Sequence, residues 1–315
     1  MLNIITAALV PAFFVMGLGY FAGKKKIIDN LHVNSLNALL MTFALPMSLF
    51  IAMAQTPVNR LSAGISLGFV MITSMLVIFG ITTFLNRRVF GKTIGETSVQ
   101  SLNVSLPNLA GVGLPLLGSL FGSGSSASVS VALAAATVTL GPLTLVMLEG
   151  QTASAGGVST FHRIVWAFLR AVRKPVVIGP VAGVAVALAG HPLPTLALQT
   201  FGLLGQATAG LALFVTGLVL SSKALNLNAN VILGVLLKNV IHPSLVFGLA
   251  ILLGFKAPEM HAAILLAAIP AGFFGVLFGL DYGVKSEDAN STLAISSLVS
   301  ILTLAVAIFL TGGMK

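Results

Sequence analysis

Residues 105–115 read SLPNLAGVGLP, and residues 269–275 read IPAGFFG. Each stretch places a proline near the middle of a long apolar run, Pro107 in the first and Pro270 in the second. Proline removes a backbone donor and clashes with the preceding helical turn, and the neighbouring glycines permit irregular backbone. The sequence therefore predicts two helices that are broken near their centres.

Both stretches belong to a chain that is built almost entirely from apolar runs. Of its 315 residues, 57% are hydrophobic and 7% are charged, whereas roughly 25% are charged in an ordinary soluble domain. So few charges cannot solvate a water-facing surface of this size, and the runs have the length that a bilayer-spanning helix needs. We expect ten membrane-spanning helices, over residues 4–22, 35–54, 63–85, 97–121, 127–148, 175–188, 196–220, 230–253, 260–282 and 291–310.

The basic residues indicate the orientation of these spans. The opposite connections and the chain end hold only Arg60, Lys256 and Lys315. Because cytoplasmic loops attract Lys and Arg, we expect the odd-to-even connections in the cytoplasm and both termini on the outer side. Those odd-to-even connections contain Lys24, Lys25, Lys26, Arg87, Arg88, Lys92, Arg163, Arg170, Arg173, Lys174, Lys223 and Lys285.

Several kinds of chemistry lack the residues that they need. The net charge of +9 lies in membrane loops, so no nucleic-acid partner is expected. The chain has no cysteine, its five histidines lack metal-ligand spacing, and no glycine-rich phosphate loop precedes Lys-Ser or Lys-Thr. We therefore expect no enzyme activity, no metal site and no cofactor.

The two halves of the chain repeat. A shift of 163 positions takes Pro107 to Pro270 and carries the starts of the second to fifth spans close to those of the seventh to tenth. We expect a first five-helix repeat in residues 1–148, a cytoplasmic connection in 149–174 and a second repeat in 175–315. Because each half has an odd number of helices, the second half enters the membrane inverted, a common plan for secondary transporters.

Two matched breaks at mid-membrane indicate a central binding site. Unpaired backbone groups in a bilayer are tolerated only where protein or a water-filled cavity satisfies them. The half-helix N-termini after the breaks carry partial positive charge and free N–H groups that suit an anion. The alternative is that these are ordinary proline kinks with packing glycines. The candidate substrate-binding residues are Asn108, Pro107, Pro270, Asn103, Gly111, Gly272 and Lys238.

Lys238 is the one basic residue well inside a predicted span. It could brace a broken helix by donating to freed carbonyls, attract an anionic substrate, or snorkel to the interface. Asn103 could equally form an interhelical hydrogen bond. No Asp or Glu lies in the middle of a span, so proton or sodium exchange through a buried carboxylate is not expected, while sodium binding by carbonyl and amide oxygens stays open.

Five short motifs recur in order along the chain: ALP at 44–46, LPN at 106–108, GLPLL at 113–117, LFVTG at 213–217 and DYG at 281–283. These motifs resemble signatures of the auxin efflux carrier family, which holds plant auxin exporters and bacterial malonate or malate permease-like proteins. The resemblance implies an all-α membrane fold like that of NhaA and the bile acid symporters, with crossed, broken fourth and ninth helices. It also implies elevator-type movement, homodimers as a common assembly and, for a bacterial member, the inner membrane with periplasmic termini.

The sequence thus predicts a secondary carrier for small organic anions, such as the carboxylates malonate or malate, bound where the broken helices cross. The alternatives are an anion channel, a membrane-embedded anion-binding receptor, or a carrier of auxin-like aromatic carboxylates. The missing buried carboxylates and histidine pairs argue against an intramembrane enzyme.

Overall fold

The computed structural model describes residues 2–28, 33–56, 65–113, 116–117, 120, 126–152, 165–166, 169, 173–190, 193–221 and 225–312. Within these ranges, all regular structure is helical apart from one isolated bridge between Pro107 and Ala271. Most of the 149–174 connection, with Arg163 and Arg170, lies outside the described residues.

The helices of the first half follow the apolar runs. A π-helical turn, η2 (Leu40–Ala44), joins α2 to α3, and a second one, η3 (Leu109–Gly113), follows the first break. The α-helices are α1 (Leu2–Lys24), α2 (Val33–Leu39), α3 (Leu45–Ala54), α5 (Ile65–Arg88), α6 (Ile94–Ser105) and α8 (Ser126–Thr152).

The second half contains a third π-helical turn, η5 (Leu237–Ile241), between α13 and α14. The α-helices are α10 (Pro175–Leu188), α11 (Thr195–Gly205), α12 (Thr208–Ser221), α13 (Ala229–Leu236), α14 (His242–Leu252), α15 (Ala257–Ala268), α16 (Phe274–Asp281) and α17 (Glu287–Gly312).

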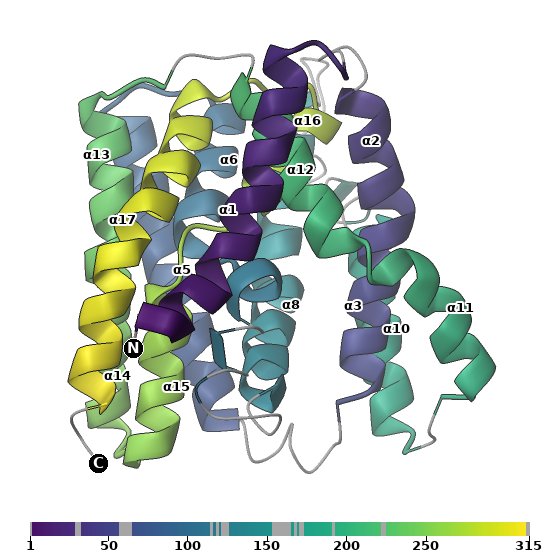
Figure 1. Ribbon diagram of the computed structural model, residues 1–315, viewed down its shortest axis with the longest axis vertical. Coiled ribbons are helices and arrows are strands. Elements are labelled where there is room, and N and C mark those ends of the chain that lie inside the picture. Colours follow the sequence, from purple (N-terminus) through teal and green to yellow (C-terminus); the bar gives the residue numbers. More distant parts are fainter. Residues whose placement is uncertain are drawn as a thin grey trace.

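Helix is present in each of the ten ranges that the apolar runs predict. Within the described ranges, five helical stretches are long and apolar enough to cross a membrane: Val33–Ala54, Ile65–Arg88, Thr195–Ser221, Ala229–Leu252 and Glu287–Thr311. The chain is therefore a multi-pass membrane protein, while the count of ten crossings and the inverted repeat stay predictions. In Figure 1, α1 begins and α17 ends in the lower half of the view.

The helices divide into two bundles according to which of them pack together. In the first, α1 packs against α12, and α3 packs against α10 and α11; with α2 and η2, we name this set the peripheral bundle. In the second, α5, α6, η3, α8, α13, η5, α14, α15, α16 and α17 pack on one another; we name it the crossover bundle. Figure 1 shows α3, α10 and α11 on the right and α13, α14 and α17 on the left.

Glycines allow the helices of the peripheral bundle to approach one another until their backbones are in contact. A Cβ added to Gly19 of α1 or to Gly217 of α12 would overlap a backbone carbonyl of the facing helix. The same holds for Gly179 and Gly183 of α10, which lie against α3. Among the described glycines, none makes such an approach between the two bundles. Within the peripheral bundle the helices are therefore packed closely, whereas side chains separate it from the crossover bundle.

Candidate functional site

The two predicted breaks are present and meet each other. Helix α6 ends at Ser105 and α15 ends at Ala268, and the backbone beyond each end is extended at Leu106 and at Ile269. Residues 106–108 and 270–272 then pair as a short antiparallel bridge. Its two hydrogen bonds run from the Asn108 amide to the Pro270 carbonyl at 2.9 Å and from the Gly272 amide to the Leu106 carbonyl at 2.7 Å.

Two glycines make the crossing sterically feasible. A Cβ on Gly272 would lie 2.6 Å from the Leu106 carbonyl oxygen, closer than real Cβ atoms approach. A Cβ on Gly275, in the first turn of α16, would overlap the Val99 carbonyl and the Asn103 side chain on α6. Larger residues at these positions would push the two broken helices apart.

Lys238 satisfies a backbone carbonyl that the second break leaves free. Its side chain is completely buried, and its Nζ donates to the Ala267 carbonyl at 2.5 Å. Ala267 belongs to the last turn of α15, where helical carbonyls have no partner further along the helix. The ammonium therefore braces the broken helix, and its burial excludes snorkelling to the interface.

The next residue, Asn239, supports the other side of the same break. Its Oδ1 accepts a hydrogen bond from the Ser296 hydroxyl at 2.7 Å, and the Ser296 oxygen accepts one from the Ala271 amide at 3.0 Å. The Asn239 amide also donates to the Ser296 carbonyl. The π-helical turn η5 thus presents two consecutive polar side chains to the break.

Asn103 connects the first broken helix to the second. Its Oδ1 accepts from the Val276 amide at 3.2 Å, and its Nδ2 donates to the Ala289 carbonyl at 3.2 Å. Because Val276 lies in the first turn of α16, Asn103 occupies one of the free N–H groups at that half-helix N-terminus. Asn103 lies in the interhelical contact that the sequence allowed as an alternative.

A small cavity of about 20 Å³ lies at the crossing, between the two bundles. The peripheral bundle lines it with α1 and α12, and the crossover bundle lines it with both breaks and α17. Three of its lining side chains are polar, and none is charged. The lining residues are Phe13, Met16, Asn108, Val112, Leu213, Thr216, Pro270, Phe273, Leu293 and Ser297.

The polar groups of this crossing cavity come from three elements. Asn108 is buried at the first break, Thr216 lies on α12, and Ser297 lies on α17. The hydroxyls of Thr216 and Ser297 each donate at 2.8 Å to the carbonyl one turn earlier in their own helix. The hydrogen of a hydroxyl rotates about the C–O bond, so the hydroxyl can leave this bond and donate to a ligand instead.

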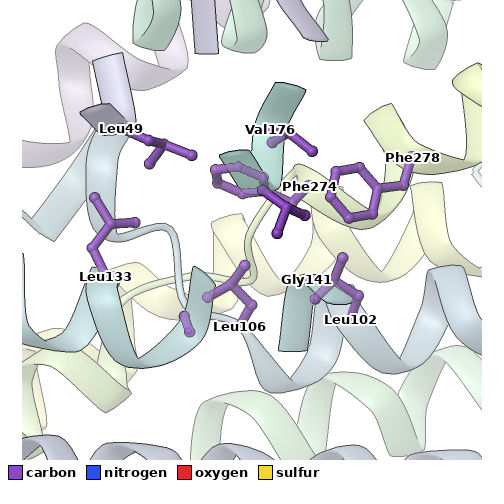
Figure 2. A pocket seen from close by; sticks show the side chains of 10 residues that line it. Leu49, Leu102, Leu106, Leu133, Gly141, Val176, Phe274 and Phe278 are labelled. Carbon is purple, nitrogen blue, oxygen red and sulfur yellow. The ribbon is translucent and has the colours of Figure 1, made fainter. Parts of the chain in front are cut away.

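A second small cavity, also of about 20 Å³, lies between the bundles and is lined by apolar side chains alone. Leu49, Val176 and Val177 line it from the peripheral bundle, while Leu106 and Phe274 line it beside the two breaks. Figure 2 shows that the side chains drawn around it carry carbon alone and surround the space from several helices. The two cavities together make the boundary between the bundles mostly apolar near the crossing.

The predicted residues therefore separate into three groups. Pro107, Asn108, Pro270 and Gly272 meet at the crossing, and Asn108 and Pro270 line the crossing cavity. Asn103 and Lys238 support the breaks from neighbouring helices. The backbone of Gly111 lies in η3, directly after the first break.

Four residues of this region were not expected from the sequence: Thr216, Ser297, Asn239 and Ser296. They lie in apolar helical runs, where a single polar residue is usually a packing residue. Thr216 lies within the LFVTG stretch that resembles a family motif. Gly275 lies within the 269–275 stretch that predicts the second break, although its close approach to α6 was not expected.

Polar contacts between the bundles are few and involve one helix. Among the described residues, two hydrogen bonds join the bundles: Asn37 Nδ2 donates to the Leu277 carbonyl at 3.1 Å, and Lys174 Nζ donates to Asp281 at 3.2 Å. Lys174 also lies over the Tyr282 ring, 4.7 Å from its centroid. Leu277 and Asp281 both belong to α16, so the polar contacts of the peripheral bundle go to the half-helix after the second break and its C-cap.

Comparison with known proteins agrees with this architecture. A family model described as "Membrane transport protein" matches residues 4–308. The chain is 24% identical over 314 residues to "Uncharacterized transporter YfdV" of Escherichia coli (strain K12), covering 99% of both chains. It is 29% identical over 315 residues to "Putative malonate transporter" of Rhizobium meliloti (strain 1021), covering 97% of this chain and 95% of the relative.

A plant relative matches over a shorter region. "Auxin efflux carrier component 6" of Arabidopsis thaliana is 27% identical over 126 residues, which is 39% of this chain and 22% of the relative. The family match extends over nearly the whole chain, through both broken helices and both bundles, and it confirms the resemblance of the sequence motifs. The chain belongs to the membrane transport protein family, the family of the auxin efflux carriers.

Proposed function

We propose that this protein is a secondary carrier for small organic anions, and that the anion's carboxylate binds in the crossing cavity. The observation that supports this most directly is the cavity itself, which lies between two separately packed bundles and beside both helix breaks. Broken helices at mid-membrane supply backbone groups that can bind a substrate without exposing them to lipid.

We also propose an elevator mechanism, in which the crossover bundle moves against the peripheral bundle. Three features support it: close glycine packing within the bundles, apolar cavities between them, and two recorded polar contacts across the boundary. An apolar boundary lets side chains slide with little loss of hydrogen bonds, whereas backbone contacts at glycine distance resist sliding.

The lining of the crossing cavity bears on the class of anion. Asn108, Thr216 and Ser297 can donate to a carboxylate, and the remaining lining is apolar. Burying a second charge without a charged partner is costly. The lining thus favours one carboxylate with a short apolar body, while the name of the Rhizobium relative points to malonate.

A thermal-unfolding screen of the purified protein tests the function. We expect malonate, malate or phenylacetate to stabilise it, since a ligand at 100 times its Kd adds about 2.7 kcal/mol to the free energy of unfolding. The Thr216→Val and Asn108→Ala variants should lose most of this response. If no carboxylate stabilises the protein, or if both variants respond like the wild type, the assignment is wrong.

Thr82→Val provides a matched control for Thr216→Val. Thr82 is buried in α5, and its hydroxyl makes the same 2.8 Å bond to the carbonyl one turn earlier, but it lines neither cavity. Its removal should leave the ligand response unchanged.

Transport measurements separate a carrier from an anion channel or a receptor. In proteoliposomes, unlabelled substrate loaded inside should accelerate the entry of labelled substrate. The reason is that the binding site of a carrier returns to the outer side with internal substrate bound. Conductance that does not saturate with substrate concentration would indicate a channel instead.

A further inference from the structure

Lys238 is a buried lysine without a carboxylate partner among the described residues. Its side chain is completely buried, and its Nζ donates a hydrogen bond to the Ala267 carbonyl. The recorded ion pairs of the described residues join Lys92 to Asp288 and Lys174 to Asp281. The described Asp and Glu residues all lie in the first or last turns of helices.

The surroundings fix the position of this side chain. Its Nζ lies at the C-terminal end of α15, where the helix macrodipole places partial negative charge. The neighbouring Asn239 is held by Ser296, which also accepts from the Ala271 amide. The Nζ of Lys238 is thus held at the Ala267 carbonyl, three residues before Pro270 in the chain. Pro270 lines the crossing cavity.

We propose that Lys238 is the resident counter-charge of the bound anion. It is a positioning residue that stays outside the crossing cavity and raises the affinity for an anion through its field. This inference rests on the proposed function, because it requires an anion in that cavity. The inference goes beyond the structural role of Lys238. That role needs only a hydrogen bond to the Ala267 carbonyl, whereas a counter-charge needs a positive charge.

The expected size of the effect depends on the distance from Nζ to the anion. Three residues of extended chain span at most about 11 Å from Ala267 to Pro270, and the contacts of Nζ and of the anion at the two ends add to this span. A unit positive charge about 12 Å from the anion, at an effective dielectric constant of about 20, should strengthen anion binding about tenfold.

The test compares each anion with its neutral amide. Binding of malonate, malonamide, phenylacetate and phenylacetamide is measured on the wild type and on Lys238→Gln, whose amide can still donate to Ala267. We expect Lys238→Gln to weaken carboxylate binding about tenfold and to leave amide binding nearly unchanged. A purely structural role would weaken both ligands of a pair equally.

Ser296→Ala is the matched control. It removes the partner of the Ala271 amide and disturbs the same break without changing any charge. It should weaken the carboxylate and the amide by the same factor. If it lowers the carboxylate-to-amide ratio as Lys238→Gln does, the charge of Lys238 is not the cause.

The remaining outcomes are also decisive. If the wild type binds no carboxylate, the proposed function fails and this inference fails with it. If the wild type binds carboxylates and Lys238→Gln keeps the same ratio, the role of Lys238 alone is wrong. If Lys238→Gln does not fold, Lys238→Ala is compared in ethylammonium and in ethanol. The variant must then bind the carboxylate more tightly than the amide when ethylammonium is added, and must lack this preference when ethanol is added.

Discussion

At the scale of single residues, Gly272 carries the geometry of the crossing. Its amide donates to Leu106, and its missing side chain leaves room for the same carbonyl oxygen. No rotamer change can relieve a Cβ placed there, because the clash is with backbone. Glycine is therefore required here by the neighbouring chain segment and not by the local backbone conformation of Gly272 itself.

We expect Gly272→Ala to destabilise the protein by about 1–3 kcal/mol or more, since overpacking that displaces backbone costs at least this much. Thermal unfolding in detergent measures the change. Gly248→Ala in α14 is the control, because a Cβ there meets nothing within 4 Å; its stability should stay equal or rise. Equal stability of Gly272→Ala and the wild type would contradict the crossing geometry.

Asn103 gives a second prediction at this scale. Asn103→Ala leaves the Val276 amide and the Ala289 carbonyl without their side-chain partner. Leaving a buried polar group unpaired costs about 1–3 kcal/mol, so the melting temperature should fall. A melting temperature that is unchanged, together with lost ligand response, would instead assign Asn103 to substrate binding.

At the scale of helices, α16 is the element through which the bundles are joined by polar contacts. Asp281, at its end, accepts from Lys174 of the peripheral bundle, and both side chains are about one-third exposed. We expect Asp281→Asn to change the transport rate by no more than about fivefold and to leave stability nearly unchanged, because exposed ion pairs contribute roughly 0.2–1 kcal/mol. Transport and unfolding of the same variant are compared.

The pair of Lys92 and Asp288 is the contrasting case inside the crossover bundle. Their charged atoms lie 2.7 Å apart, and Asn228 and Asn230 also donate to Asp288. The hydrogen bond to Asp288 raises the pKa of Lys92, so the contribution of the lysine's charge to stability is complete below the ordinary lysine pKa of about 10.4 and is lost as pH rises through the raised value.

Asp288→Asn should therefore lower stability measurably at neutral pH, because a part-buried carboxylate with three donors is replaced by a neutral group. Its unfolding free energy should fall more than that of Asp281→Asn. The opposite order of the two variants would contradict the burial and hydrogen bonding of Asp288.

At the scale of the whole molecule, the natural absence of cysteine makes cross-linking specific. We expect a short, cleavable thiol cross-linker between Lys174→Cys and Asp281→Cys to arrest transport while ligand binding persists, because it joins the two bundles. The same reagent between Lys92→Cys and Asp288→Cys joins helices of one bundle and should permit transport. If the protein cross-linked between Lys174→Cys and Asp281→Cys transports as fast as it does without the cross-link, elevator movement is contradicted.

The fold was predictable from the sequence where its causes are local. Apolar runs and prolines act within one or two helical turns, so the helical ranges and both breaks could be read directly. The partners of Lys238, Asn103 and Asn37 could not, because their hydrogen bonds reach residues 29 to 240 positions away. The π-helical turn that presents Lys238 and Asn239 together also left no sequence signal.

The sequence by itself determined a membrane protein of a transporter family with two broken helices, since composition, proline position and motif order need no contact map. Only the tertiary structure decided that the two breaks pair, that Lys238 ends on Ala267, and that the helices separate into two bundles with cavities between them. The physical reason is that these features depend on which helices pack together, and many arrangements of apolar helices satisfy the same hydropathy pattern.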